Sequence, residues 1–167
     1  QTFDVVVSQF GFMFFPDRAK ALREMIRVLR PQGRLAVAVW NSLDATPAIA
    51  AEVGLLDRMA GSAAANALRA PFVLGDPAIL EQLARDADLA DATVTTKPGT
   101  ARFPSIRSLV EADLRGWLPV LGVVLDEELI QHILAEAERE LHQYVDGNGN
   151  AVFPISAHIL SGARSKR

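Results

Sequence analysis

The first 40 residues alternate between short apolar runs and one amphipathic stretch. Residues 3–8 (FDVVVS) are apolar on consecutive positions, a pattern typical of a strand covered on both faces in a parallel sheet. From Asp17, the expected N-cap, apolar side chains recur at helical spacing as far as Arg30. Leu35 to Trp40 is a second apolar run. This order of strand, helix and strand predicts a βαβ unit with two parallel strands.

The remaining chain predicts more helices and two further strands. Asp76 and Asp126 each precede an amphipathic stretch and are expected helix caps. The predicted elements are helices over 47–60 and from Asp76, a soft stretch over 61–63, a strand over 92–97 ending at a Pro98-Gly99 turn, helices over 105–114 and from Asp126, and a last strand over 152–163. The fold class is therefore predicted to be α/β.

Composition narrows the function classes. The chain has 167 residues and a formal net charge of -3, which gives no electrostatic support for binding nucleic acid. It contains no cysteine, which excludes disulfides, thiolate metal sites and cysteine nucleophiles. No apolar run is long enough to span a bilayer, so we expect neither a membrane partner nor a location other than the cytoplasm.

Residues 22–33 (LREMIRVLRPQG) carry the most specific pattern. They resemble the L-x-E-x-x-R-V-L-x-P-G-G signature of class I S-adenosylmethionine (SAM)-dependent methyltransferases, in the ubiquinone/menaquinone-biosynthesis-type, methyltransferase type 11-like branch. Gln32 stands where the signature has glycine, which predicts some strain in that turn. The resemblance is strong from Phe3 to Trp40. Beyond Trp40 it rests on the order of the predicted helices and strands.

This resemblance implies a partial Rossmann-like methyltransferase fold, from the fourth strand onward, with a helical insertion before the last strand. Residues 1–103 and 147–167 are then expected to form the α/β core. Residues 104–146 are expected to form the helical insertion, where such enzymes often build a substrate lid.

The cofactor loop of the family is expected to lie outside this chain. No Gly-x-Gly pattern follows a strand here, and Gly147-x-Gly149 stands in a turn after a helix. The chain also begins with Gln1 at the edge of a predicted strand. We therefore expect the C-terminal part of a methyltransferase, inactive alone, whose complete protein uses SAM as cofactor.

The candidate site follows from where strands end. In open α/β sheets, ligands bind beyond the carboxyl ends of the strands. The resemblance assigns cofactor binding to the first predicted strand end and substrate binding to nearby aromatic and amide residues. The cofactor-binding candidates are Ser8, Gln9, Phe10 and Gly11, and the substrate-binding candidates are Phe14, Trp40 and Asn41. Two alternatives to ligand binding stay open. The loop could connect the strand to the helix without binding a ligand, and its phenylalanines could be core residues.

No residue is singled out as a catalytic base, and no metal site is predicted. His132 and His142 are ten residues apart on one predicted helix, too far to share an ion. Asp146 begins a loop that resembles a calcium loop but has Ala151 in place of its glycine.

The favoured function is SAM-dependent methyl transfer to a small-molecule acceptor. The alternative is a non-catalytic α/β interaction or dimerisation domain, with a homodimer formed through the exposed half-sheet. A dinucleotide-dependent oxidoreductase is less favoured.

Overall fold

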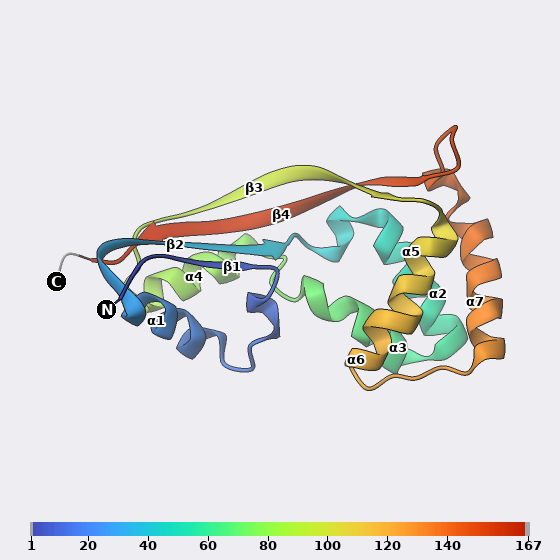
Figure 1. Cartoon of the computed structure of the whole chain (residues 1–167), viewed down its shortest axis with the longest axis horizontal. Helices are drawn as coiled ribbons and strands as arrows, with labels where there is room; N and C mark the ends of the chain where they lie inside the picture. Colours follow the sequence, from blue (N-terminus) through green and yellow to red (C-terminus); the bar gives the residue numbers. More distant parts are fainter. Residues whose placement is uncertain (1, 166–167) are drawn as a thin grey trace. The chain divides into compact units, whose positions relative to one another are not determined.

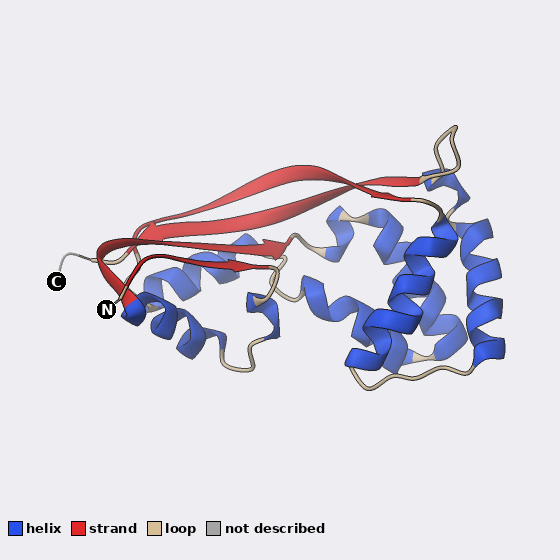
Figure 2. Cartoon of the chain, in the orientation of Figure 1, coloured by secondary structure: helices blue, strands red, loops and turns tan. Residues whose placement is uncertain are grey.

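The computed structural model describes residues 2–165 and contains one four-stranded sheet with helices (Figures 1 and 2). The strands are β1 (Phe3–Gln9), β2 (Leu29–Trp40), β3 (Ala90–Phe103) and β4 (Ala151–Ala163). The helices are α1 (Arg18–Val28), α2 (Pro47–Ala60), α3 (Ser62–Arg69), α4 (Pro77–Asp86), α5 (Ile106–Ala112), α6 (Leu118–Val120) and α7 (Glu127–Glu140). Short 3-10 turns are η1 (Phe12–Phe14), η2 (Leu43–Ala45), η3 (Ala70–Phe72) and η5 (His142–Tyr144), and η4 (Asp113–Trp117) is a π-helix. The predicted α/β class is confirmed.

The chain divides into two compact units. The first holds residues 1–42, 71–98 and 156–167, and the second holds 43–70 and 99–155. This differs from the predicted division, because α2 and α3 join the helices after residue 104 instead of the α/β core. The apolar faces of α2 and α3 pack against each other, and α2 packs on α7, so burial groups segments that are distant in sequence.

The predicted βαβ unit is present, with β1 parallel to β2 and joined to it through α1. The Asp17 side chain accepts a hydrogen bond from the Lys20 backbone N–H (2.8 Å), as expected of an N-cap. β2 begins at Leu29, earlier than the predicted Leu35, because the chain after the helix already runs along β1. An irregularity in the register falls between the pairs that involve Phe3 and Val5.

The Pro-Gln-Gly segment of β2 makes a tight local turn. Gln32 has φ 65°, a left-handed conformation that glycine adopts more easily. A Cβ at Gly33 would lie 2.9 Å from the Arg30 carbonyl oxygen and 3.1 Å from that of Asp4, so this position has no room for a side chain. The expected strain at Gln32 is therefore present in the backbone.

The last strand, β4, lies between β2 and β3 and runs antiparallel to β2. Thr93 and Thr96 of β3 contact Ser161 and His158 of β4, so β3 is antiparallel to β4. The prediction of a turn at Pro98-Gly99 was wrong, because β3 continues through both residues. An edge strand tolerates proline, whose missing N–H faces away from the ladder.

One face of the sheet in the first unit carries the hydrophobic core. Leu35, Val37 and Val39 of β2 are buried in this core. Other buried members are Phe12, Met13, Leu22, Leu29, Leu74, Leu80, Ala84, Leu89 and Leu160. Figure 1 shows α1 and α4 on this same side of the sheet.

The opposite face of β1 is bare. Val5 and Val7 are 57% and 70% exposed, although consecutive apolar residues predicted cover on both faces. β1 is also an edge of the sheet, so the backbone groups on its outer side have no neighbouring strand. Both features agree with the expected exposed half-sheet.

The second unit is mainly helical, and it also holds the end of β3 and the start of β4. Asp126 caps α7 as predicted, with its carboxylate accepting from the Leu129 N–H (2.8 Å). The stretch over 61–63 was predicted to be soft, but α3 begins there, after Gly61 at φ 84° redirects the chain from α2. Within residues 2–165, no helix is long and apolar enough to cross a bilayer.

Candidate functional site

The carboxyl ends of β1 and β2 meet at one edge of the sheet. Gln9 stands opposite Ala38 in the parallel register, and the Phe10 N–H donates to the Ala38 carbonyl oxygen (3.0 Å). Trp40 ends β2 two residues later. The structure therefore brings the predicted cofactor-binding and substrate-binding residues of these two strands together.

An aromatic pair forms at this edge. The rings of Phe10 and Trp40 stack with centroids 3.9 Å apart and an interplanar angle of 13°. Phe10 has φ 52°, which costs a side-chain-bearing residue roughly 1–2 kcal/mol relative to ordinary conformations. The ring stacking and the backbone hydrogen bond to Ala38 hold this conformation. Such backbone strain is concentrated at functional sites, which makes Phe10 the most distinctive residue of the site.

The other predicted cofactor-binding residues surround Phe10. Gln9 is exposed and Ser8 is half-buried. Gly11 starts the 3-10 turn η1, and a Cβ built there would lie 3.6 Å from the Ser8 hydroxyl oxygen. The loop thus presents small and polar groups beside the aromatic pair.

Asn41 has a structural task in the connection after β2. Its amide Nδ2 donates to the Ser156 hydroxyl (2.9 Å), and its Oδ1 accepts from the Ser42 backbone N–H (2.7 Å). Both ends of the amide are engaged, so this side chain orients the strand end next to Trp40. A role in substrate binding stays a prediction.

Phe14 and its neighbours divide between loop and core. Phe12 and Met13 are buried in the core of the first unit, as the core interpretation expected. Phe14 and Phe15 are each 42% exposed. Phe14 therefore lies at the surface of the loop and is not part of the Phe10–Trp40 stack, and its role in substrate binding stays a prediction.

His158 and Gly75 support the site and were not predicted. His158 is 2% exposed, and its Nε2 donates to the Gly75 carbonyl oxygen (3.0 Å) while Nδ1 accepts from the Thr96 hydroxyl (2.9 Å). A Cβ at Gly75 would lie 2.3 Å from the Ser42 Cα, so the glycine backbone packs directly against the end of β2. The sequence signal that could have indicated an inward-facing His158 is its position two residues before the apolar Leu160, because residues two apart in a strand share a face.

The clearly shifted pKa values among the described residues lie away from this edge of the sheet. Among the described residues, the ionisable groups whose pKa departs clearly from its ordinary value all belong to the second unit. They are Glu52, Asp113, Arg115, Glu127 and Asp146. Within the part of the chain that the structure describes, no group of three or more metal-ligating side chains forms. The geometry therefore offers an aromatic wall and polar loop groups, and it singles out no base.

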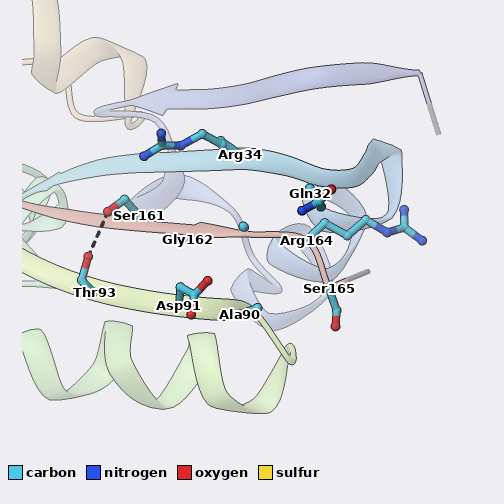
Figure 3. Close-up of a pocket in the computed structure, with 10 residues that line it drawn as sticks. Gln32, Arg34, Ala90, Asp91, Thr93, Ser161, Gly162, Arg164 and Ser165 are labelled. Atoms are coloured by element: carbon cyan, nitrogen blue, oxygen red, sulfur yellow. Dashed lines mark hydrogen bonds between the residues drawn. The ribbon is translucent and has the colours of Figure 1, made fainter. Parts of the chain in front are cut away.

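A separate pocket of about 680 Å³ lies near the start of β2 (Figure 3). Arg34, Asp91 and Thr93 are among its lining residues. The hydroxyl oxygens of Thr93 and Ser161 are joined by a hydrogen bond (3.0 Å). Arg164, also in the lining, uses its guanidinium Nη1 to cap the end of α1 at the carbonyl oxygens of Arg27 and Leu29. This pocket is at the opposite end of β2 from Trp40 and is distinct from the candidate site.

Comparison with known proteins connects this geometry to a family. Residues 1–37 match the sequence profile of the methyltransferase domain. Uncharacterized proteins of Mycobacterium tuberculosis and Mycobacterium bovis are 46% identical over 39 residues, which cover 23% of this chain and 14% of theirs.

Solved structures resemble the fold over nearly the whole chain. A methyltransferase candidate from Bacillus halodurans matches with TM-score 0.51 and 15% identity, over 98% of this chain. The YcgJ protein of Bacillus subtilis matches with TM-score 0.50 and 17% identity, over 99%. This chain spans 65% of the length of each, and likeness at this identity establishes the fold alone. The sequence resemblance to class I methyltransferases and the fold prediction are thereby confirmed, while the ubiquinone-type branch and the expected C-terminal position stay predictions.

Proposed function

We propose that this chain forms the acceptor-side part of a SAM-dependent methyltransferase. The premises are that residues 1–37 match the methyltransferase-domain profile and that the fold is similar to that of a methyltransferase. The observation that carries the proposal is the Phe10–Trp40 stack at the carboxyl edge of the parallel strands. Ligands of open α/β sheets bind at that edge.

The residues at this edge suit one part of the cofactor. SAM supplies a methyl group on a positively charged sulfonium, and an aromatic face attracts a nearby cation. The aromatic pair would also exclude water from the reacting atoms, and the polar loop at Ser8 and Gln9 would orient the ligand. Because the positive charge on the sulfonium makes the thioether a good leaving group, the protein would contribute mainly proximity and alignment.

The acceptor is proposed to be a small molecule. The net charge of -3 and the scattered basic residues give no surface that would neutralise a phosphate backbone. The aromatic pair and the partly exposed Phe14 of the following turn favour an acceptor with apolar surface, since ligand sites are lined mainly by hydrophobic groups.

The cofactor loop is proposed to come from outside these residues. No strand of the structure is followed by Gly-x-Gly, the pattern that lets a backbone approach the cofactor closely. The chain alone is therefore proposed to be inactive.

Calorimetric titration with S-adenosylmethionine, which carries the sulfonium charge, tests this proposal. The probe is titrated into the chain and into a version extended by the sequence encoded upstream. We expect the extended protein to bind at least about 100-fold more tightly, a difference of about 2.7 kcal/mol. In the extended protein, Trp40→Leu should weaken binding about 10-fold. Phe15→Leu is the matched control, because that ring lies on the same loop but outside the Phe10–Trp40 stack.

The two parts of the proposal fail separately. Tight binding by the chain alone would show that the cofactor loop is not needed from elsewhere. Absence of binding by the extended protein would contradict a methyltransferase function.

A second candidate function is an interaction or dimerisation domain. The observation in its favour is the exposed apolar face and free edge of β1. Unpaired strand edges and bare apolar patches favour association with another chain. A homodimer through this half-sheet is the proposed assembly, and its test is the oligomeric state of the chain in solution.

A further inference from the structure

The pocket near the start of β2 is built on the outer face of the sheet. Leu35 and Leu160 point into the core of the first unit. Residues next to them in their strands point the other way, and they include Arg34, Ser161 and Ala163. The pocket volume of about 680 Å³ lies within the range of small-molecule sites, about 300–1,000 Å³.

The strand register places a cation and an anion in one row across three strands. Arg34 of β2 pairs with Ala163 of β4. The side-chain pairs of β3 with β4 are Thr93 with Ser161 and Thr96 with His158. Both pairs share one antiparallel register, and it puts Asp91 opposite Ala163. Figure 3 shows Arg34 and Asp91 on the strands on either side of β4, and both line the pocket.

The middle of this row carries only a methyl group. Because Ala163 is small, the two charged side chains are separated by a notch two strand spacings wide, each of roughly 4.8 Å. The neighbouring Gly162 is backed by the core, since a Cβ there would lie 2.6 Å from the Cγ of the buried Leu89. Core packing therefore fixes the floor of the notch.

The two charged side chains of the row have no partner of their own. Among residues 2–165, neither Arg34 nor Asp91 forms a side-chain hydrogen bond or ion pair, and both are exposed. By contrast, Arg30 of the same strand is paired with Asp4 (2.9 Å). Arg164, the other cation of the lining, already donates through Nη1 to backbone carbonyl oxygens. The pocket thus presents one unpaired guanidinium and one unpaired carboxylate.

Asp91 occupies this row in a strained conformation. Its φ of 51° lies in the left-handed region, which side-chain-bearing residues seldom adopt. No contact of its side chain within the described chain compensates for this strain. Backbone strain of this kind is concentrated at functional positions.

We propose that this pocket binds a small zwitterion. Its carboxylate pairs with Arg34, whose guanidinium donates two parallel N–H bonds to such a group. One O–H of the Thr93–Ser161 pair is free to donate as well, because only one of the two hydroxyls donates to the other. The ammonium of the ligand pairs with Asp91, and the notch over Ala163 holds the segment that joins the two charges.

The two opposite charges favour a zwitterion over a ligand with a single charge. A simple anion on Arg34 would be repelled by Asp91, and a simple cation on Asp91 would be repelled by Arg34. A ligand with both charges gains two attractions. The pocket lies at the opposite end of β2 from Trp40, so the proposal does not depend on the proposed methyl transfer.

NMR titration of the whole chain with glycylglycine tests the proposal. This peptide has an ammonium at one end and a carboxylate at the other. We expect the backbone amide signals of Thr93 and Ala163 to shift and to saturate. N-acetylglycylglycine lacks the ammonium and glycylglycinamide lacks the carboxylate, and each should bind at least about 5-fold more weakly.

Two variants separate the contributions of the two charges. In Asp91→Asn, glycylglycine should bind no more tightly than its acetylated form, and asparagine tolerates the left-handed φ. In Arg34→Gln, it should bind no more tightly than its amide. Arg23→Gln is the matched control, because Arg23 is an exposed arginine outside the pocket lining, and it should keep the full affinity.

Three results would overturn the proposal. The first is an absence of saturable shifts at Thr93 and Ala163 with glycylglycine. The second is equal or tighter binding of the acetylated peptide, which would indicate a site for anions. The third is an unchanged preference for glycylglycine in both Asp91→Asn and Arg34→Gln, which would place binding elsewhere.

Discussion

Gln32 adopts a left-handed backbone conformation at a position where the methyltransferase signature has glycine. Its N–H donates to the Arg164 carbonyl oxygen (3.1 Å), and the Arg164 N–H donates back to the Gly33 carbonyl oxygen (2.8 Å). These two bonds fix the turn between β2 and the end of β4. The strain at Gln32 is therefore tolerated because its neighbours hold the backbone in place.

Replacing Gln32 by glycine should stabilise the chain. Removal of the left-handed penalty of about 1–2 kcal/mol outweighs the added freedom of glycine in the unfolded state, which leaves a gain of about 0.5–1 kcal/mol. Urea denaturation measures the difference in free energy of unfolding. Gln32→Ala is the control, since it keeps a Cβ at the same φ and should gain nothing. An equal gain in both variants would mean that the strain is not the cause.

The residues of the candidate site could be predicted only in part. Strand ends are visible in the sequence, and they indicated Ser8 through Gly11 and also Trp40. The stacking of Phe10 on Trp40 could not be predicted, because it requires the register of two strands and an unusual φ at Phe10. His158 was missed for a similar reason, since its partners Gly75 and Thr96 are distant in sequence.

At the scale of single elements, the helix caps were predicted correctly. Asp17, Asp76 and Asp126 each accept a hydrogen bond from a backbone N–H in the first turn of their helix. Ser105, the first residue of the helix predicted over 105–114, does the same. A cap acts within a few residues, so sequence is enough to find it. Elements that depend on neighbours were placed less well, such as β3, which continues through Pro98 and Gly99.

Asp126→Ala should destabilise the second unit by about 1 kcal/mol, because α7 would lose the acceptor for the Leu129 N–H. Asp126→Asn keeps a side-chain acceptor and should lose much less. Thermal unfolding followed by circular dichroism measures both. If alanine and asparagine were equally destabilising, charge rather than capping would be the source of the stability, in line with the helix dipole.

At the scale of the whole molecule, the bare face of β1 is the feature with the largest consequence. Parallel sheets are normally covered on both faces, and here the core helices of the first unit cover one. The two similar structures are longer than this chain, which spans 65% of each. The uncovered side of β1 is therefore an apolar surface that a second copy of the chain can occupy.

We expect the chain in isolation to self-associate through β1. Val7→Lys should produce a monomer, because a charged side chain on an edge strand opposes pairing with another strand. Val124→Lys is the matched control, since Val124 is an exposed apolar residue of the second unit (81% exposed) and its replacement should leave the association unchanged. Sedimentation velocity distinguishes these outcomes. A wild-type chain that stays monomeric at all concentrations would contradict this prediction.

The amino-acid pattern was enough to predict the βαβ unit, the helix starts, the resemblance in residues 22–33 and the polar strand end at Ser8. These features depend on hydrophobic period, on capping within one turn, and on residue types at fixed spacing, all of which are local. The three-dimensional packing was needed to establish the Phe10–Trp40 stack, the complete burial of Glu52, and the grouping of α2 and α3 with the later helices. Such contacts join residues that are far apart in the chain, and they form only where burial of apolar surface brings whole elements together.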